Sequence, residues 1–227
     1  MIRLTRYGWP EIVLLPSVFS LIILLGLLAG TRFLPGWLLW TIEAVAGVFL
    51  VFTITFFRDP ERVIAFDKNA ILAPADGKIT NIDTVENDYV GKKTVRIGIF
   101  LSIFDVHINR CPCNVKVDRT SYKKGTFKNA ANPVSGRVNE SNDLYLIRTD
   151  NPTDKLLVRQ ISGAIARRIV CRAQPGQHLA GGERFGMIKF GSRTEIYLPC
   201  RNDIIIPAKV GDKVKAGLSI LAKYTEE

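Results

Sequence analysis

The sequence predicts a β-rich α+β protein, with a lipoyl-like barrel-sandwich core preceded by a transmembrane helical hairpin. Residues 12–30 and 34–57 are almost purely apolar, and a helix needs about 20 such residues to cross a bilayer. From residue 70 onward, short runs of β-branched and aromatic residues alternate with turn residues. This alternation is typical of a domain built from many short strands.

The two apolar runs are expected to form a membrane-anchoring hairpin over residues 1–58, with a short turn at Thr31–Gly36. A secretory signal peptide is the alternative for the first run, but its apolar region is only about 7–15 residues long and precedes a small-residue cleavage site. Neither feature fits this sequence well. Trp9, Trp37 and Trp40 lie near the ends of the runs, where aromatic belts form in membrane proteins.

Basic residues flank both ends of the hairpin, and the turn contains only Arg32. The positive-inside rule therefore predicts that both ends, and the domain over residues 59–227, lie on the cytoplasmic side of the cell membrane. Glu43 interrupts the second run. It is expected near the outer interface, or in a segment that lies partly in the headgroup layer. The flanking basic residues are Arg3, Arg6, Arg58 and Arg62.

The domain that follows the hairpin is basic. Residues 1–58 hold four of the 31 basic and two of the 21 acidic residues, so residues 59–227 carry a net charge of +8. Beside a bilayer, such a surface favours anionic lipid. Nucleic acid also suits a basic protein, but the sequence contains no nucleic-acid-binding motif, so no nucleic-acid partner is expected.

The four cysteines do not have the spacing of a zinc site, and no metal is expected. In the cytoplasm they should remain thiols and act as small buried hydrophobic residues. They are Cys111, Cys113, Cys171 and Cys200.

Two segments of the predicted β domain resemble each other, residues 73–79 and 207–218. Both look like the Gly-turn strand pairs of lipoyl- and biotin-carrier domains, in which two such halves pack around a pseudo-twofold axis. The strands expected elsewhere cover residues 93–101, 114–122, 143–147, 155–161, 165–171, 187–190 and 195–198.

Three residues that are far apart in the sequence could carry chemistry together: Asp76, His107 and Ser192. A serine hydroxyl is a poor nucleophile until a base removes its proton, and a carboxylate can orient that base. Gly191 permits the strained turn in which a hydroxyl attacks the carbonyl of the preceding residue. Taken singly, the three are equally well explained as a turn aspartate, a structural histidine and a turn serine.

Six segments, in order, make the sequence similar to the phosphatidylserine decarboxylase precursors of the short bacterial and archaeal kind. The resemblance covers about residues 56–223. Longer relatives have a second histidine where this chain has Arg110, so His107 must serve both self-cleavage and turnover, or another group takes one role. They also often have threonine where this chain has Arg193. The segments are Phe57–Arg62, Ala73–Lys78, Phe104–Arg110, Ser162–Ile169, Gly182–Gly186 and Phe190–Arg193.

The resemblance implies that the chain cuts itself between Gly191 and Ser192, giving residues 1–191 and 192–227, which stay associated. Asp76 would orient His107, and His107 would deprotonate Ser192. Ser192 would then become a covalent pyruvoyl cofactor, which acts as an electron sink in place of pyridoxal phosphate.

The substrate implied by the resemblance is phosphatidylserine or an archaeal serine ether phospholipid, converted into the ethanolamine phospholipid. His107 would protonate the carbanion that remains after loss of CO2. Four basic residues are candidates for contact with the lipid phosphate, although a solvated basic loop explains them equally well. They are Lys123, Lys124, Lys128 and Arg137.

Two other functions stay open. A pyruvoyl-dependent decarboxylase of another amine carboxylate would cut itself in the same way, and only substrate assays would separate it from a lipid enzyme. A non-enzymatic, membrane-anchored lipoyl-like adaptor would remain one chain and would not need Asp76, His107 or Ser192. The sequence also leaves the oligomeric state open, although a homodimer is common in such families.

Overall fold

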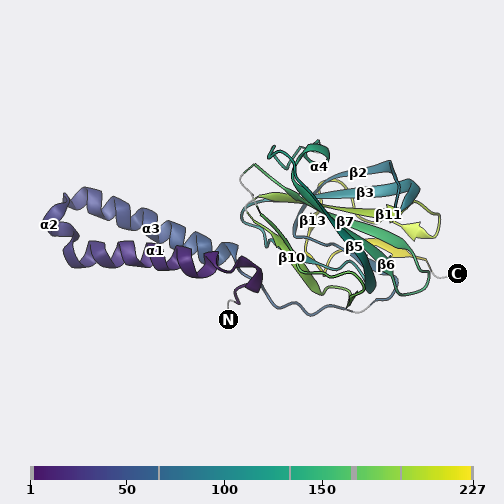
Figure 1. Ribbon diagram of the computed structural model, residues 1–227, viewed down its shortest axis with the longest axis horizontal. Helices are drawn as coiled ribbons and strands as arrows, with labels where there is room; N and C mark the ends of the chain where they lie inside the picture. Colours follow the sequence, from purple (N-terminus) through teal and green to yellow (C-terminus); the bar gives the residue numbers. More distant parts are fainter. Residues whose placement is uncertain (1–2, 66, 133, 165–167, 190, 226–227) are drawn as a thin grey trace. The chain divides into compact units, whose positions relative to one another are not determined.

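The chain forms two compact units, Met1–Glu61 and Arg62–Glu227, shown in a computed structural model (Figure 1). The first unit is helical and the second consists mainly of strands, so the predicted β-rich class with N-terminal helices is confirmed. Residues 165–167 and 190, which belong to two of the recognised segments, lie outside the described residues. The structure describes residues 3–65, 67–132, 134–164, 168–189 and 191–225.

The N-terminal unit is a hairpin of two long helices that lie side by side (Figure 1). An 18-residue span from Glu11 has a mean hydropathy of 2.5, and the second helix has a mean hydropathy of 2.0. Both helices are therefore long and apolar enough to cross a membrane. The elements are a 3-10 turn (Arg6–Gly8), α1 (Glu11–Leu25), a π-helical turn (Gly26–Gly30), α2 (Thr31–Phe33) and α3 (Gly36–Phe56).

The turn of the hairpin is shorter than Thr31–Gly36. Helical structure continues to the end of α2, and the chain reverses at Leu34 and Pro35. Leu34 is extended, with φ −126° and ψ 145°, because a proline disfavours the helical conformation of the residue before it. Gly30 lies where α3 approaches, and a Cβ there would be 2.5 Å from Leu39 Cδ1. Small residues allow such close helix packing.

The C-terminal unit is built on an eight-stranded antiparallel sheet, in the order β13-β2-β3-β11-β7-β6-β5-β9. The described strands also form two three-stranded sheets, β1-β14-β12 and β4-β10-β8. A short helix, α4 (Ser135–Val138), lies between β5 and β6 in the chain. The strands are β1 (Ala70–Leu72), β2 (Gly77–Asn87), β3 (Gly91–Leu101), β4 (Ile108–Arg110), β5 (Val115–Lys123), β6 (Ser141–Arg148), β7 (Lys155–Ser162), β8 (Ile169–Cys171), β9 (His178–Leu179), β10 (Arg184–Ile188), β11 (Ser192–Pro199), β12 (Ile204–Ile205), β13 (Lys213–Val214) and β14 (Ile220–Tyr224).

The strands predicted from the sequence overlap β3, β5, β6, β7, β8, β10 and β11. The hydrophobic pattern does not predict the long strand β2, because polar residues such as Thr80, Asn81 and Asp83 occupy its middle. The sheet order does not by itself confirm a lipoyl-like barrel-sandwich.

Strand β11 lies in the middle of the large sheet, between β3 and β7. Successive side chains of a strand point to opposite faces of its sheet. Ile196 and Leu198 belong to the hydrophobic core, and Ser192 shares their face. Arg193 and Glu195, also fully buried, belong to the other face. The start of this strand is therefore fixed from both sides.

Candidate active site

Ser192 is the first residue of β11, and it pairs with Leu101 of β3 and Ser162 of β7. The residue is fully buried, and its Oγ has no hydrogen-bond partner among the described residues. Most buried polar atoms are hydrogen bonded, so an unbonded one requires an explanation. A hydroxyl that no neighbour engages is available for reaction.

Gly191 has the backbone conformation that the sequence suggested. Its φ is +67°, in the left-handed region, which glycine adopts at the least steric cost. Its carbonyl oxygen lies so close to Gly163 that a Cβ on Gly163 would collide with it. Gly163 was not predicted as a site residue, although it lies in the recognised segment Ser162–Ile169. The sequence shows only that residue 163 has no side chain. The reason for the glycine becomes clear once the Gly191 carbonyl is seen to lie against it.

His107 is fully buried and lies directly before β4. Its Nδ1 is 2.9 Å from the main-chain oxygen of Asp105, and its Nε2 accepts a hydrogen bond from the Gly191 amide at 3.3 Å. A carbonyl oxygen only accepts hydrogen bonds, so Nδ1 carries the proton. The structure thus brings His107 to the Gly191–Ser192 bond with an unprotonated Nε2, which is the tautomer of a general base.

Asp76 has a different partner from the one expected. Its carboxylate accepts two hydrogen bonds from Arg62, at 2.6 and 2.8 Å, and a third from the Ala216 amide at 2.8 Å. A bidentate bond from a guanidinium is among the strongest a carboxylate can make. The structure therefore brings Asp76 onto Arg62 and not onto His107, whose Nδ1 is held by Asp105 instead.

Asp76 is nevertheless connected to the histidine through the main chain. The Pro74 carbonyl accepts hydrogen bonds from the Arg110 amide at 3.0 Å and from Asn109 Nδ2 at 3.3 Å. Both donors belong to β4, which follows His107 directly. The loop that contains Asp76 therefore borders the strand that positions His107.

A chain of buried amide side chains lies on the Ser192 face of the sheet. Asn109 Nδ2 donates to Thr194 Oγ1 at 3.1 Å, and Gln160 Nε2 donates to Asn109 Oδ1 at 2.9 Å. Asn142 Nδ2 donates in turn to Gln160 Oε1 at 3.1 Å. A satisfied buried network makes its surroundings rigid. Sequence reasoning missed these residues, because polar positions inside strands resemble solvent-facing ones.

A cavity of about 230 Å³ lies beside Gly191. Apolar side chains and glycine main chain form most of its wall, and Asn129 contributes a polar side chain. The four basic candidates, Lys123, Lys124, Lys128 and Arg137, are exposed, and Lys128 directly precedes the lining residue Asn129 in the sequence. The lining residues are Phe100, Ile103, Asn129, Ala130, Gly163, Ala164 and Gly191.

The cysteines were predicted to be buried thiols. Cys111 and Cys113 are buried, Cys171 is half-buried, and Cys200 is exposed, so the prediction is wrong for Cys200. Burial raises the pKa of the Cys113 thiol to about 12, and it raises the pKa of Cys111 well above its usual value. Both thiols are therefore poor nucleophiles near neutral pH.

Comparisons with known proteins agree with this arrangement. The family model described as phosphatidylserine decarboxylase matches residues 49–222. A phosphatidylserine decarboxylase proenzyme of Nitrosomonas europaea is 40% identical over 222 residues, covering 97% of this chain and 95% of its own. Proenzymes of the same description from Pelodictyon phaeoclathratiforme and Burkholderia ambifaria are 39% and 36% identical, each over at least 97% of both chains.

The matches and the site together define a decarboxylase, an enzyme of the carboxy-lyase class. More specifically, the chain belongs to the phosphatidylserine decarboxylase family. The matched region contains His107, Gly191 and Ser192.

Proposed function

We propose that this chain is a proenzyme that cuts itself between Gly191 and Ser192 and then decarboxylates phosphatidylserine or an archaeal serine ether phospholipid. The observation that carries the proposal is the position of His107. Its unprotonated Nε2 faces the Gly191 amide, beside a buried Ser192 hydroxyl that has no hydrogen-bond partner among the described residues.

The self-cleavage begins when His107 Nε2 takes the proton of the Ser192 hydroxyl. Catalytic hydrogen bonds are often not yet formed in a resting structure, and rotation of the Ser192 side chain brings Oγ to Nε2. Oγ bonds to the Gly191 carbonyl carbon, the peptide C–N bond breaks, and the Ser192 nitrogen takes up a proton. Gly191 is in the left-handed conformation, with φ +67°, which glycine adopts at the least steric cost.

A base then removes the Cα proton of residue 192, the electron pair forms the Cα–Cβ double bond, the Cβ–Oγ bond breaks, and residue 191 leaves as a carboxylate. Residue 192 becomes a dehydroalanine, and water replaces its nitrogen, which leaves as ammonia. The products are residues 1–191 and residues 192–227 with a pyruvoyl group at the new end. Because β11 is paired with β3 and β7 of the larger product, the two chains stay associated.

The residues around Ser192 fit a pyruvoyl group at that position, because the hydroxyl is buried, unengaged and next to a general base. The pyruvoyl group supplies an electron-accepting carbonyl that stabilises negative charge when the substrate loses CO2. His107 then delivers a proton to the substrate carbon. Its buried position excludes water from this step.

In this proposal, Asp76 has a structural role and does not contact His107. It neutralises the buried charge of Arg62 and fixes the loop whose Pro74 carbonyl binds β4. His107 is therefore held through the main chain, while the Asp105 carbonyl selects its tautomer. This assignment replaces direct orientation of the imidazole by the Asp76 carboxylate.

The proposed lipid site combines the cavity beside Gly191 with the basic segment next to it. The cavity takes the serine headgroup, and the exposed amines of Lys123, Lys124 and Lys128, with Arg137, contact the phosphate. The hairpin over residues 1–58 anchors the domain of residues 59–227 at the cytoplasmic side of the cell membrane, so the acyl or ether tails stay in the bilayer. Two copies are expected to form a homodimer, which a mass measurement in detergent tests.

We also propose that the core descends from the lipoyl-like barrel-sandwich plan. The two similar segments lie against each other: Lys213 and Val214 of β13 pair with Lys78 and Gly77 of β2. The Ile79 amide further donates to the Asp212 carbonyl at 2.9 Å. Reciprocal pairing of this kind supports two halves related by a pseudo-twofold axis.

The decisive experiment is intact mass spectrometry of the purified wild type and of Ser192→Ala, followed by assay on phosphatidylserine vesicles. We expect wild type as two chains split at Gly191/Ser192, with a pyruvoyl on the smaller chain, and Ser192→Ala as one chain. A folded wild type that stays whole would support the adaptor. A cleaved wild type that releases no CO2 from the lipid would support a decarboxylase of another amine carboxylate.

A further inference from the structure

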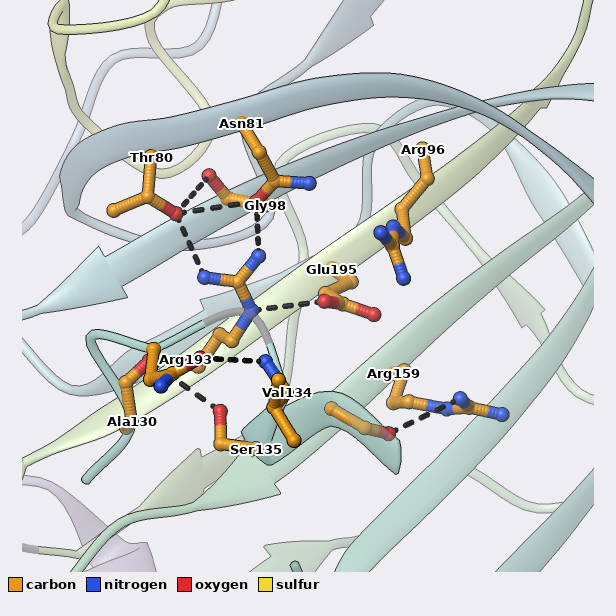
Figure 2. Close-up of polar contacts among 12 residues, drawn as sticks. Thr80, Asn81, Arg96, Gly98, Ala130, Val134, Ser135, Arg159, Arg193 and Glu195 are labelled. Atoms are coloured by element: carbon orange, nitrogen blue, oxygen red, sulfur yellow. Dashed lines mark hydrogen bonds and ion pairs between the residues drawn. The ribbon is translucent and has the colours of Figure 1, made fainter. Parts of the chain in front are cut away.

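Arg193, directly after the cleavage serine, makes three hydrogen bonds through its guanidinium. It points to the face of β11 opposite Ser192 and is fully buried. Figure 2 shows its guanidinium between Thr80 and Asn81 on one side and Glu195 on the other. Nε donates to Glu195 Oε1 at 2.8 Å, Nη1 donates to Thr80 Oγ1 at 2.7 Å, and Nη2 donates to Asn81 Oδ1.

Two of these hydrogen bonds join the two chains that cleavage would produce. Thr80 and Asn81 lie on β2, in residues 1–191, whereas Arg193 and Glu195 lie in residues 192–227. After cleavage at Gly191/Ser192, two of the three bonds of Arg193 therefore connect the small chain to the large one. They do so one residue away from the new end.

The space for the guanidinium is built into the sheet. Gly98 on β3 is opposite Glu195, and a Cβ at Gly98 would collide with the Arg193 guanidinium. The charge is also matched, because Glu195 is fully buried and accepts a further hydrogen bond from the Tyr197 hydroxyl at 2.7 Å. Burial and the Glu195 carboxylate both raise the pKa of Tyr197, so it remains a donor.

We propose that Arg193 is the positioning residue for the pyruvoyl end of the small chain, an inference that rests on the proposed self-cleavage. Before cleavage, residue 192 is held by covalent bonds on both sides. Afterwards it begins a chain, and free chain ends fray readily. The fixed guanidinium prevents β11 from fraying, so that residue 192 stays beside His107.

If Arg193 positions the new chain end, substitution of Arg193 should impair the processed enzyme more than it impairs the precursor. A misplacement of about 1 Å at a reacting group can reduce a rate about 100-fold. Lysine keeps the charge but lacks the planar fork that reaches Thr80, Asn81 and Glu195 together. We expect Arg193→Lys to cut itself at a rate close to wild type but to lose about 10- to 100-fold in kcat per pyruvoyl group, with little change in KM.

The test compares full-length wild type, Arg193→Lys and Arg193→Met/Glu195→Gln. The double variant removes both buried charges, and it keeps the question answerable if a single charge removal prevents folding. Arg159→Lys is the matched control, because Arg159 lies in the same polar layer but makes its two short bonds to Asp143 of its own product chain. Its contact with the smaller chain is a 3.5 Å approach to the Tyr197 hydroxyl, five residues from the new end. Intact mass gives the cleavage rate and pyruvoyl content, and hydrogen exchange reports fraying of residues 192–196 in the processed protein.

The proposal predicts faster exchange at residues 192–196 and a lower kcat per pyruvoyl group in both Arg193 variants, but not in Arg159→Lys. Equal exchange and equal kcat per pyruvoyl in processed Arg193→Lys would overturn it, even if the thermal stability fell. Absence of cleavage in wild type would instead refute the proposed function. The two failures are therefore distinguishable.

Discussion

Neighbouring residues on the two faces of strand β11 differ in their hydrogen bonding. On one face, the Ser192 hydroxyl is buried without a hydrogen-bond partner among the described residues. It directly follows Gly191, whose amide donates a hydrogen bond to His107. On the other face, the Arg193 guanidinium makes three side-chain hydrogen bonds. The same strand thus presents a reactive atom on one side and a fully satisfied ion pair on the other.

The difference shows how a protein can cut its own chain without losing its fold. A nucleophile must be free to move onto the adjacent carbonyl, so its own contacts must be few. The residue beside it must then hold the strand in register when a covalent connection is lost. Buried, fully bonded polar groups are suited to this, because leaving any of them unpaired is costly.

The largest effect is expected from removal of the base on the Ser192 face. His107→Gln keeps an amide that can bond to the Gly191 N–H but cannot accept the Ser192 proton. Self-cleavage should slow by about 10²- to 10⁴-fold, and intact mass should show one chain of 25.3 kDa. His178→Gln, at the only other histidine and exposed on β9, is the matched control and should be cut like wild type. Normal cleavage of His107→Gln would assign the base to another group.

A smaller effect is expected from displacing the Gly191 carbonyl. Gly163→Ala puts a Cβ where that oxygen lies, so the carbonyl must move and self-cleavage should slow by about 10- to 100-fold. Gly47→Ala is the control, because nothing lies within 4 Å of a Cβ there. A cleavage time course of the two variants measures the difference. Equal rates would show that the close approach of Gly163 is not needed for the reaction.

The Arg62–Asp76 pair tests whether the carboxylate acts on His107 directly or through the loop. The pair is almost buried, with side-chain exposures of 7% and 11%. Breaking such a pair from either side costs about 3–5 kcal/mol of unfolding free energy. Arg62→Gln and Asp76→Asn should therefore lower stability and cleavage alike.

The double variant should then be no worse than either single one, because both changes remove the same interaction. Chemical denaturation and cleavage rates measure this cycle. If Asp76→Asn stopped cleavage while Arg62→Gln left it intact, the Asp76 carboxylate would serve His107 directly.

The smallest effect is expected at the cysteines, which show that burial alone does not make a group reactive. Cys111 and Cys113 are buried like Ser192, and burial raises the pKa of both thiols. In the folded protein at pH 7, an alkylating reagent should label exposed Cys200 and leave these two unmodified. Peptide mass mapping before and after denaturation measures this. Rapid labelling of Cys111 in the folded protein would contradict the inert role.

The sequence alone was sufficient for those features that depend on composition and local pattern. The two apolar runs predict two helices because a 3.6-residue helix of about 20 apolar residues is read directly from the chain. Runs of β-branched and aromatic residues between turn residues predict strands such as β3 and β7. The order of Asp76, His107, Gly191 and Ser192 within six recognised segments was enough to suggest the chemistry, and the left-handed glycine was a local expectation.

Only the tertiary structure decided which groups meet. Asp76 could have bonded to His107 or Arg62, and the close approach of Arg62 gave it the stronger, bidentate partner. The role of Gly163 depends on a carbonyl 28 residues away in the chain. The role of Arg193 depends on its partners on β2 and on the absence of a side chain at Gly98. Such pairings depend on strand order and register, which join residues distant in sequence. A local pattern records what a residue prefers, whereas its partner is set by how the whole sheet assembles.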